Sequence, residues 1–301
     1  MNTITVVGSI NQDTTLYVQA MPKPGETIRI NKMVVSGGGK GANQAIAAQR
    51  LGAKTAFIGA VGADHAGEGM LALLRKESID VAGVAVLAQE TTGQAFISVD
   101  AHGENSIMIN AGANTKFDAA HVRKYRHAIK NSDFVIVEFE SPVADSVAAF
   151  EIAHKAGVKT ILNPAPALKE IPTELLALTD LIVPNETETE ILTGIKVTDE
   201  KSMTQAAAKL ISFGVGTVVI TLGSRGVYYH VGNQSGLIPA LKVKAVDTTA
   251  AGDTFIGAVA SVLRPNFANI TEALTYGNRA SALTVQKLGA QNAIPFKRDL
   301  D

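Results

Sequence analysis

Cysteine and tryptophan are absent from this chain of 301 residues, and aromatic residues make up only 5% of it. Without cysteine the chain can form no disulfide, no thiolate metal site and no cysteine nucleophile. The six histidines form no H-E-x-x-H pattern, which disfavours histidine-based metal catalysis. The sequence also lacks a signal-peptide pattern and an apolar run of the ~20 residues that cross a bilayer. We therefore expect a cytoplasmic protein with no membrane partner.

Neither sign of charge predominates, since 27 Lys and Arg residues balance 28 Asp and Glu residues. This near-neutrality argues against a nucleic acid as a partner. A phosphate group would have to be held by local geometry rather than by bulk charge. The chain shows no repeat, low-complexity tract or flexible linker, so residues 1–301 are predicted to form a single domain.

Short apolar runs rich in β-branched residues alternate with longer alanine-rich stretches. The predicted strands are Thr3–Val7, Thr55–Ala60, Phe134–Val137, Thr160–Leu162, Leu181–Val183, Thr217–Thr221 and Val227–His230. The predicted helices are Ala42–Leu51, Gly67–Glu77, Ala119–Ile129, Val143–Ala156, Glu186–Leu192, Met203–Phe213, Phe255–Leu263 and Ile270–Val285. Apolar strands between helices are typical of a mostly parallel sheet covered on both faces. We predict an α/β fold with three layers, α/β/α.

Two segments without helical character interrupt this alternation. Residues 14–35 and 92–111 each resemble a strand, a turn and a second strand. Together they could form a small sheet that acts as a lid over a cleft or as a dimer contact, because a sheet of this size needs a covered face. Two ordinary surface hairpins are the alternative interpretation.

The segment Val246–Phe255 combines small residues with an acid at the start of an apolar helix. The free N–H groups of a helix start attract anions, phosphate above all. Asp253 would repel such a phosphate, so its presence favours a role as the base that accepts a proton from an attacking hydroxyl. Asp253 as a simple helix cap is an equally good interpretation of this segment alone.

Polar side chains also follow the first predicted strand and a glycine-rich stretch. Asn11 and Asp13 offer an amide and a carboxylate that could bind sugar hydroxyls, although an Asx turn would explain them too. The stretch Ser36–Gln44 allows a close backbone approach to a ligand. It is no P-loop, because Gly41 stands where a serine or threonine is required.

Three further groups lie after predicted strands, where ligands of parallel sheets gather. Glu140 follows one strand, and Asn185 with Glu188 follows another, a pair suited to Mg²⁺ held through water. The turn Thr221–Gly226 could face a nucleotide. Helix caps and a hairpin turn are the structural alternatives, so the argument rests on the convergence of these groups at one edge of the sheet.

Six motifs in order make the sequence similar to a known family. They are Gly38–Gln44, Asn163–Ala167, Pro184–Glu188, Thr221–Gly226, Asp247–Phe255 and Lys287–Gln291. With them the chain resembles the ribokinase-like carbohydrate kinases over essentially its whole length. The resemblance implies a largely parallel sheet between helices, a β-sheet lid, a homodimer formed through the lids, and ATP-dependent phosphorylation of D-ribose at its 5-hydroxyl.

The resemblance also implies roles for individual residues. Asp253 matches the catalytic base, and the N–H groups of Ala250, Ala251 and Gly252 match the anion hole. The sugar-binding positions are Asn11, Gln12, Asp13, Gly39, Lys40, Gly41, Ala42, Asn43, Glu140 and Asp253. The ATP-binding positions are Asn185, Thr221, Leu222, Gly223, Ser224, Arg225, Gly226, Gly252, Asp253 and Asn278. Glu188 matches the acid that governs Mg²⁺, and Asp247, Thr249, Thr284, Lys287, Gly289 and Ala293 match a K⁺ loop.

Other activities remain as alternatives at this level. Another kinase of the same family could act on deoxyribose, fructose, a keto-deoxy acid or a nucleoside. A non-catalytic sugar-binding regulator would be expected to lose the base or the anion hole, yet Gly252 and Asp253 are both present. A nicotinamide dehydrogenase is disfavoured because no G-x-G-x-x-G follows the first strand.

Overall fold

The computed structural model describes residues 1–300, which fold around one large sheet. Its strands are β1 (Thr3–Val7), β4 (Lys54–Gly62), β5 (Asp80–Leu87), β8 (Phe134–Val137), β9 (Lys159–Leu162), β10 (Leu181–Ile182), β11 (Thr217–Thr221), β12 (Val227–Val231) and β13 (Gln234–Ile238). Across these described residues the order is β13-β12-β11-β10-β9-β8-β1-β4-β5. The strands from β11 to β5 run parallel, and only β12 and β13 at one edge are antiparallel.

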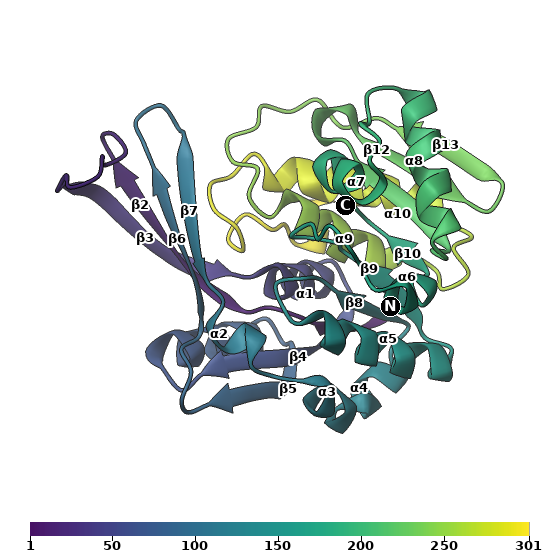
Figure 1. Ribbon diagram of the computed structural model, residues 1–301, viewed down its shortest axis with the longest axis horizontal. Helices are drawn as coiled ribbons and strands as arrows, with labels where there is room; N and C mark the ends of the chain where they lie inside the picture. The colour runs from purple at the N-terminus through teal and green to yellow at the C-terminus, as the bar shows by residue number, and fades with distance from the viewer. Residues whose placement is uncertain (301) are drawn as a thin grey trace.

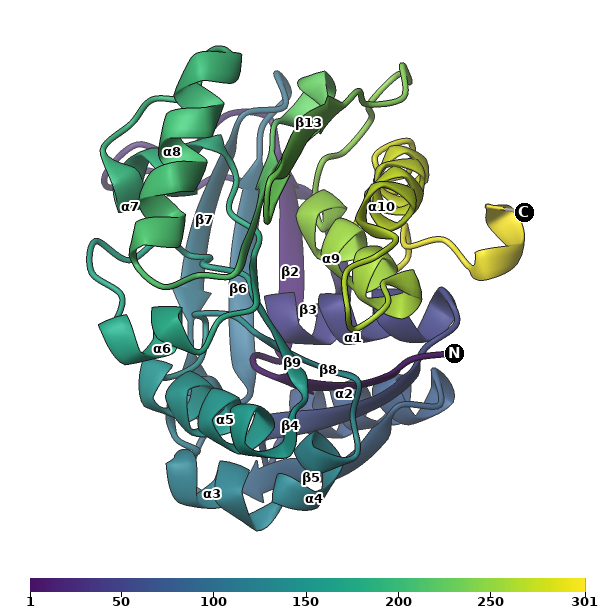
Figure 2. The same ribbon diagram turned by 90° about the vertical axis from the view of Figure 1, so that its right-hand side faces the viewer.

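Helices cover both faces of this sheet (Figure 2). One layer contains α1 (Lys40–Arg50), α2 (His65–Lys76), α9 (Ala251–Val262) and α10 (Ile270–Thr284). The other contains α3 (Ala119–Lys124), α4 (Arg126–Lys130), α5 (Val143–Ala156), α6 (Thr173–Ala177), α7 (Glu186–Thr193) and α8 (Glu200–Ser212). Each layer packs its apolar side chains against one face of the strands, which gives two buried clusters. The predicted three-layer α/β/α class is confirmed.

Small residues let α1 and α9 approach closely. A Cβ added at Gly257 of α9 would lie 2.6 Å from the Cβ of Ala47 in α1, so only glycine fits there. This packing brings the first turns of the two helices, which are far apart in sequence, to the same end of the sheet (Figure 1). Both helices therefore present their N-termini beyond the carboxyl ends of the parallel strands.

A second sheet stands away from the main body (Figure 1). It consists of β2 (Asn11–Val18), β3 (Ile30–Gly38), β6 (Gly93–Val99) and β7 (Asn105–Asn110). Within the described residues its order is β3-β2-β6-β7, with β2 and β6 parallel. The strands β2 and β3 occupy half of segment 14–35 and extend beyond both of its ends, and β6 and β7 occupy most of segment 92–111. We call these four strands the small sheet.

The structure differs from the sequence-based expectations in five places. Strands β5 and β13 and helix α6 carried too weak a pattern to be predicted, since β5 includes Gly83 and β13 includes Gly236. The helix expected over Ala119–Ile129 is divided at Tyr125 into α3 and α4. Helix α9 begins at Ala251, four residues before the expected start. None of the helices in residues 1–300 has the length and apolar character that a membrane crossing requires.

Candidate active site

A cavity of about 200 Å³ lies at the carboxyl ends of the parallel strands. It is bordered by the first residue of α1, by the ends of β9, β10 and β11, and by the start of α9. The lining residues are Lys40, Asn163, Ala165, Val183, Asn185, Glu188, Thr221, Thr248, Ala250, Ala251, Gly252, Asp253 and Ile256. The convergence at one edge of the sheet, expected from the sequence, is therefore present for the groups around Lys40, Asn185, Thr221 and Asp253.

The start of α9 presents free N–H groups to this cavity. Ala250 adopts a left-handed conformation (φ 59°), which turns the chain sharply into the helix. Ala251 donates its N–H to the carbonyl of Thr248, and Thr254 donates to the carbonyl of Ala250. The N–H groups of Ala250, Gly252 and Asp253 donate to no acceptor within residues 1–300, so of the three N–H groups matched to the anion hole only that of Ala251 is engaged. Such groups at a helix start favour an anion in front of them.

Asp253 lies in the same first turn and is only 8% exposed. Each of its carboxylate oxygens accepts one hydrogen bond from a side-chain amide. Asn43 donates Nδ2–H to Oδ2 at 3.0 Å, and Gln44 donates Nε2–H to Oδ1 at 2.9 Å. The close packing of α1 on α9 makes these contacts possible. They hold the carboxylate at the cavity wall beside the free N–H groups.

Glycines let the stretch before α1 pass close to the end of β1. Gly39 has φ 88°, and a Cβ there would lie 2.7 Å from the backbone nitrogen of Asn11. A Cβ at Gly41 would lie 2.7 Å from the backbone nitrogen of Ser9. The backbone of α1 is thereby joined to β1, because Ala42 donates its N–H to the carbonyl of Ser9 at 2.9 Å.

Glu140 connects three of the segments that the sequence analysis assigned to sugar binding. Its Oε2 accepts hydrogen bonds from Ser9 Oγ at 2.8 Å, from the Lys40 backbone N–H at 3.2 Å and from Asn11 Nδ2 at 3.4 Å. Asn11 is itself oriented, since its Oδ1 accepts Nδ2–H of Asn114 at 2.7 Å. These groups form a polar wall at the junction of the small sheet and the main body.

Asp13 stands in this wall without a hydrogen-bond partner for its buried Oδ1. Burial, together with the charges of Glu140 and Asp253, raises the pKa of Asp13 to about 7. A carboxyl group in this position gains from a ligand that donates hydroxyl hydrogens to it. The Asp13 carboxyl therefore has an oxygen free to accept a hydrogen bond from a ligand.

Two titratable groups modify the electrostatics around Glu140. Glu138 is fully buried, and its carboxyl accepts the N–H groups of Ser9 at 2.5 Å and Glu140 at 2.6 Å. Burial and the neighbouring Glu140 raise the pKa of Glu138 to about 8. Burial alone would lower the pKa of Lys40, but the carboxylates of Asp253 and Glu140 outweigh it and raise the pKa. Lys40 therefore supplies a positive charge between several acids.

On the opposite side of the cavity, α7 begins with a reciprocal cap. Asn185 Oδ1 accepts the Glu188 N–H, and the Glu188 carboxyl accepts the Asn185 N–H and its side-chain amide, all at 2.8 Å. Burial raises the pKa of Glu188, although the Asn185 N–H and Lys40 partly oppose this effect. The helix-cap interpretation is thus correct for both residues, and both also line the cavity.

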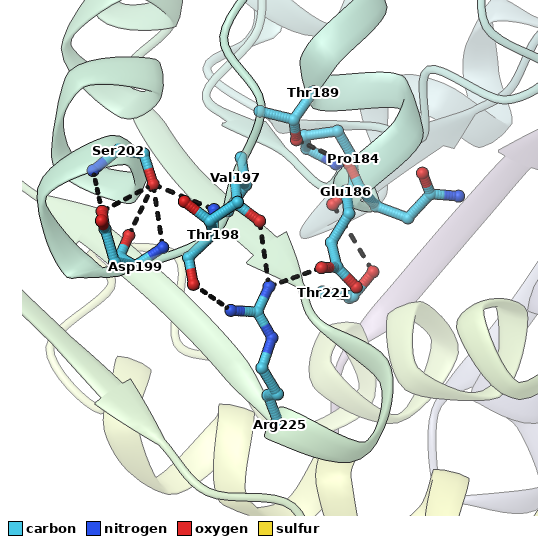
Figure 3. Close-up of polar contacts among 10 residues, drawn as sticks. Pro184, Glu186, Thr189, Val197, Thr198, Asp199, Ser202, Thr221 and Arg225 are labelled. Atoms are coloured by element: carbon cyan, nitrogen blue, oxygen red, sulfur yellow. Dashed lines mark hydrogen bonds and ion pairs between the residues drawn. The ribbon is translucent and has the colours of Figure 1, made fainter.

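The residues of the turn after β11 have different surroundings: one of them lines the cavity and another contacts neighbouring loops. Thr221 lines the cavity, whereas the guanidinium of Arg225 is bound to the Glu186 carboxylate and to the carbonyls of Val197 and Thr198 (Figure 3). Figure 3 shows the Arg225 side chain directed toward the α7–α8 connection. Arg225 therefore joins two loops in this structure and is not among the residues that line the cavity.

Asp247 joins the segment before α9 to the segment after α10. Its Oδ1 accepts the Thr249 N–H at 2.9 Å, and its Oδ2 accepts the Gly289 N–H at 2.9 Å. These hydrogen bonds outweigh the effect of burial and lower the pKa of Asp247. Asn278 of α10 donates to the carbonyls of Ile238 and Pro239, both at 3.3 Å, and so supports the chain after β13.

The remaining sequence-predicted residues lie at the border of the site or outside it. Strand alternation puts Gln12 on the face of β2 opposite Asn11 and Asp13. Ala42 is buried in one of the two apolar clusters, and Leu222 is buried in the other. Gly223, Ser224 and Gly226 form the turn after β11, and Thr284, Lys287 and Ala293 belong to α10 or follow it. Within residues 1–300, no three acidic or histidine side chains gather as a preformed metal site.

The fold brings to the site three polar residues to which the sequence analysis assigned no individual role: Glu138, and Gln44 and Asn163, which stand in two of the six motifs. Gln44 and Glu138 are fully buried, and Asn163 lines the cavity at the end of β9. Polar side chains in otherwise apolar stretches were the available signal, because a buried polar group requires a partner.

The cavity, the free helix N-terminus and the buried acid are together the features expected of a phosphoryl-transfer site. The model of the pfkB family of carbohydrate kinases matches residues 1–297. The chain belongs to the pfkB carbohydrate kinase family.

Several known proteins match this chain over nearly their whole length. The ribokinase of Staphylococcus aureus strain COL is 48% identical over 100% of this chain and 99% of its own length. The deoxyribokinase of Salmonella typhi is 33% identical over 97% of this chain and 95% of its own length. The solved structure of Arabidopsis thaliana ribokinase complexed with ribose and ATP is similar with a TM-score of 0.92. That match has 32% identity and covers 99% of this chain and 97% of the plant chain.

Proposed function

We propose that this protein transfers the γ-phosphoryl group of ATP to the 5-hydroxyl of D-ribose, forming D-ribose 5-phosphate and ADP. The observation that carries this proposal is the buried Asp253 carboxylate in the same helical turn as two free N–H groups. The relatives named ribokinase support the choice of substrate. Deoxyribose is the second candidate, because a relative with 33% identity is a deoxyribokinase.

In this proposal Asp253 is the general base. Its carboxylate accepts the hydroxyl proton as the sugar oxygen attacks phosphorus, since a sugar hydroxyl is too weak an acid to ionise beforehand. Asn11, Asp13, Asn43 and Glu140 would bind the other hydroxyls and orient the sugar. A single displacement then forms the new O–P bond while the bond to ADP breaks.

Charge on the transferring phosphoryl group requires compensation. The N–H groups of Ala250 and Gly252, together with that of Asp253, would supply it as an anion hole, whereas the Ala251 N–H is engaged by the Thr248 carbonyl. Lys40 would add a positive charge. The carboxyl of Glu188 faces the cavity and suits Mg²⁺ held through water molecules. Mg²⁺ supplies neutralisation of the nucleotide phosphates when bound.

A monovalent cation is the second proposed ion. The Asp247 carboxylate draws residues 247–249 toward Gly289, so that the carbonyls around Thr249, Thr284 and Gly289 could surround K⁺. Backbone carbonyls are suitable ligands for K⁺ because they replace its hydration shell. The loop lies directly before the anion hole, so a bound cation would stabilise its conformation.

The small sheet is proposed to act as the lid and as the contact of a homodimer. Both of its faces expose large apolar side chains, with Met33 and Ile109 each 62% exposed. Their positions in β3 and β7 put them on opposite faces. Exposed apolar residues of this number favour burial against a substrate, a second copy or both.

The direct test is Asp253→Asn, which keeps the shape of the side chain and removes the base. We expect turnover to fall by ~100-fold or more while sugar and ATP still bind. Turnover would be measured as ADP release, and binding by calorimetry. Near-normal turnover of Asp253→Asn would remove this residue from the role of base.

A panel of D-ribose, 2-deoxyribose, fructose and a nucleoside identifies the acceptor. We expect D-ribose to have the highest kcat/KM, because Asn11, Asp13 and Glu140 offer several hydrogen-bonding groups to a polyhydroxyl ligand. A preference for deoxyribose would favour the second candidate. Phosphorylation of none of these sugars would contradict the proposed function.

A further inference from the structure

Gln44 is the fully buried residue that connects Asp253 to the strand ends behind it. Its Nε2 donates one hydrogen to Asp253 Oδ1 at 2.9 Å and the other to Asn163 Oδ1 at 3.0 Å. Asn163 in turn donates Nδ2–H to the carbonyl of Val183 at 3.4 Å. The carbonyl of Val183 thus sets the direction of the whole chain of hydrogen bonds.

The donors and acceptors leave only one orientation for these amides. Val183 offers an acceptor, so the Asn163 amide must direct its nitrogen there and its oxygen toward Gln44. Two acceptors, one on Asn163 and one on Asp253, then face the two hydrogens of Gln44 Nε2. The Oε1 of Gln44 has no partner in the described residues, although it is buried. An unpaired buried oxygen is costly, which indicates that the amide is present for its donor group.

Gln44 differs from Asn43 in its exposure and in the oxygen that it binds. Asn43 is 6% exposed, donates to the other oxygen, Asp253 Oδ2, and belongs to the expected sugar-binding residues. Gln44 is 0% exposed, so it presents no accessible surface to the sugar or the nucleotide. Any effect of Gln44 on the reaction must act through Asp253.

We propose that Gln44 is a positioning residue that fixes the rotation of the Asp253 carboxylate through the relay from Asn163. This inference rests on the proposed role of Asp253 as base. Without the amide, the carboxylate loses the donor on Oδ1 and can rotate toward Asn43. A misplaced base costs turnover and leaves sugar binding nearly unchanged, because the sugar-binding residues Asn11, Asp13 and Glu140 lie outside the relay.

The test is Gln44→Leu, with Gln49→Leu as the matched control. Gln49 is on the same helix, and its Oε1 accepts the Thr55 N–H at 3.0 Å. We expect Gln44→Leu to lower kcat roughly 100-fold, the size expected for a misplaced catalytic group, with the KM for sugar changed less than about threefold. Gln49→Leu should lower the melting temperature and leave kcat within about twofold.

A second variant keeps the proposal testable if Gln44→Leu does not fold. Gln44→Glu can donate to Asp253 only while the new carboxyl is protonated, so its kcat should recover as the pH falls, whereas that of the unmodified protein should not. A pH profile of kcat for Gln44→Glu parallel to that of the unmodified protein would overturn the proposal. So would a kcat for Gln44→Leu within about threefold of the Gln49→Leu control.

Combination with Asp253→Asn separates this inference from the proposed function. If Asp253 is the base and Gln44 acts through it, adding Gln44→Leu to Asp253→Asn should lower turnover no further. Normal turnover of Asp253→Asn would contradict the proposed base itself. A large loss in Asp253→Asn, with none in Gln44→Leu, would contradict only the positioning role.

Discussion

Replacement of Asp13 by asparagine should stabilise the protein and weaken sugar binding at the same time. Asp13 has a buried oxygen without a partner, and burial, Glu140 and Asp253 raise its pKa from 3.8 to about 7. Asn retains the shape but carries no charge. The folded protein therefore no longer has to hold an ionised group among like charges.

The expected gain follows from the pKa of Asp13 in the two states. Below pH 4 the group is protonated in both states, so it costs nothing. Between pH 4 and 7 the unfolded chain ionises and the folded protein does not, so the free energy of unfolding falls as the pH rises. At about 1.36 kcal/mol per pKa unit, the cost above pH 7 is at most about 4 kcal/mol. Relaxation of the site around the ionised group reduces this to ~2 kcal/mol.

Urea denaturation of the unmodified protein and of Asp13→Asn at pH 5 and pH 8 measures this effect. We expect the variant to gain ~2 kcal/mol at pH 8 and about half of that or less at pH 5. The KM for the sugar should rise by ~10-fold or more, because the amide offers one acceptor oxygen in place of two charged ones. Asp100→Asn is the matched control. Its carboxyl lies in the exposed turn of the small sheet and accepts the His102 and Glu104 N–H groups, so no gain is expected.

Two results would refute this reasoning. A variant no more stable than the unmodified protein at pH 8 would mean that the Asp13 carboxylate is not held unfavourably by its surroundings. A gain independent of pH would show that the change acts through packing or hydrogen bonding rather than through ionisation.

Three further predictions concern other parts of the molecule. Burial and the neighbouring Asp118 raise the pKa of Asp145 to about 7, so Asp145→Asn should raise the unfolding free energy by ~2 kcal/mol at pH 8 and little at pH 4, measured by urea denaturation. Equal gains at both pH values would contradict this cause. Turnover should be higher in K⁺ than in Na⁺ at the same ionic strength, and Asp247→Ala should abolish the difference; equal initial rates of the unmodified protein in both salts would count against the cation loop. Ile109→Asp should shift a dimer toward monomer in sedimentation experiments, and an unchanged sedimentation coefficient would remove Ile109 from the contact.

Much of the fold was predictable because its signals are local. Strand Thr3–Val7, strand Phe134–Val137 and helix Val143–Ala156 have the bounds expected from their patterns. In each, the strand or helix propensity of the residues and their pattern of burial favour the same structure. Strand β5 was not predicted, because its alanines and Gly83 have low β propensity. Its pairing with β4 stabilises the strand in the folded protein.

Parts of the candidate site depended on contacts that no local pattern carries. The early start of α9 requires Ala250 to adopt the left-handed conformation. Alanine rarely adopts it, so the residue type gave no reason to predict it. Arg225 stands in a motif assigned to the nucleotide, yet its side chain reaches Glu186, 39 residues away in sequence. Glu138 follows a wholly apolar strand, and only the folded chain reveals that its carboxyl accepts two N–H groups.

The amino-acid sequence by itself determined the alternation of strands and helices, the chemical groups available to a site, and the small residues at the start of α9. The tertiary structure alone decided which of these groups meet. Asn43 and Asp253 are 210 residues apart and lie within hydrogen-bonding distance only because α1 packs on α9. Such a contact depends on the packing of two whole helices, and so no short stretch of sequence contains it.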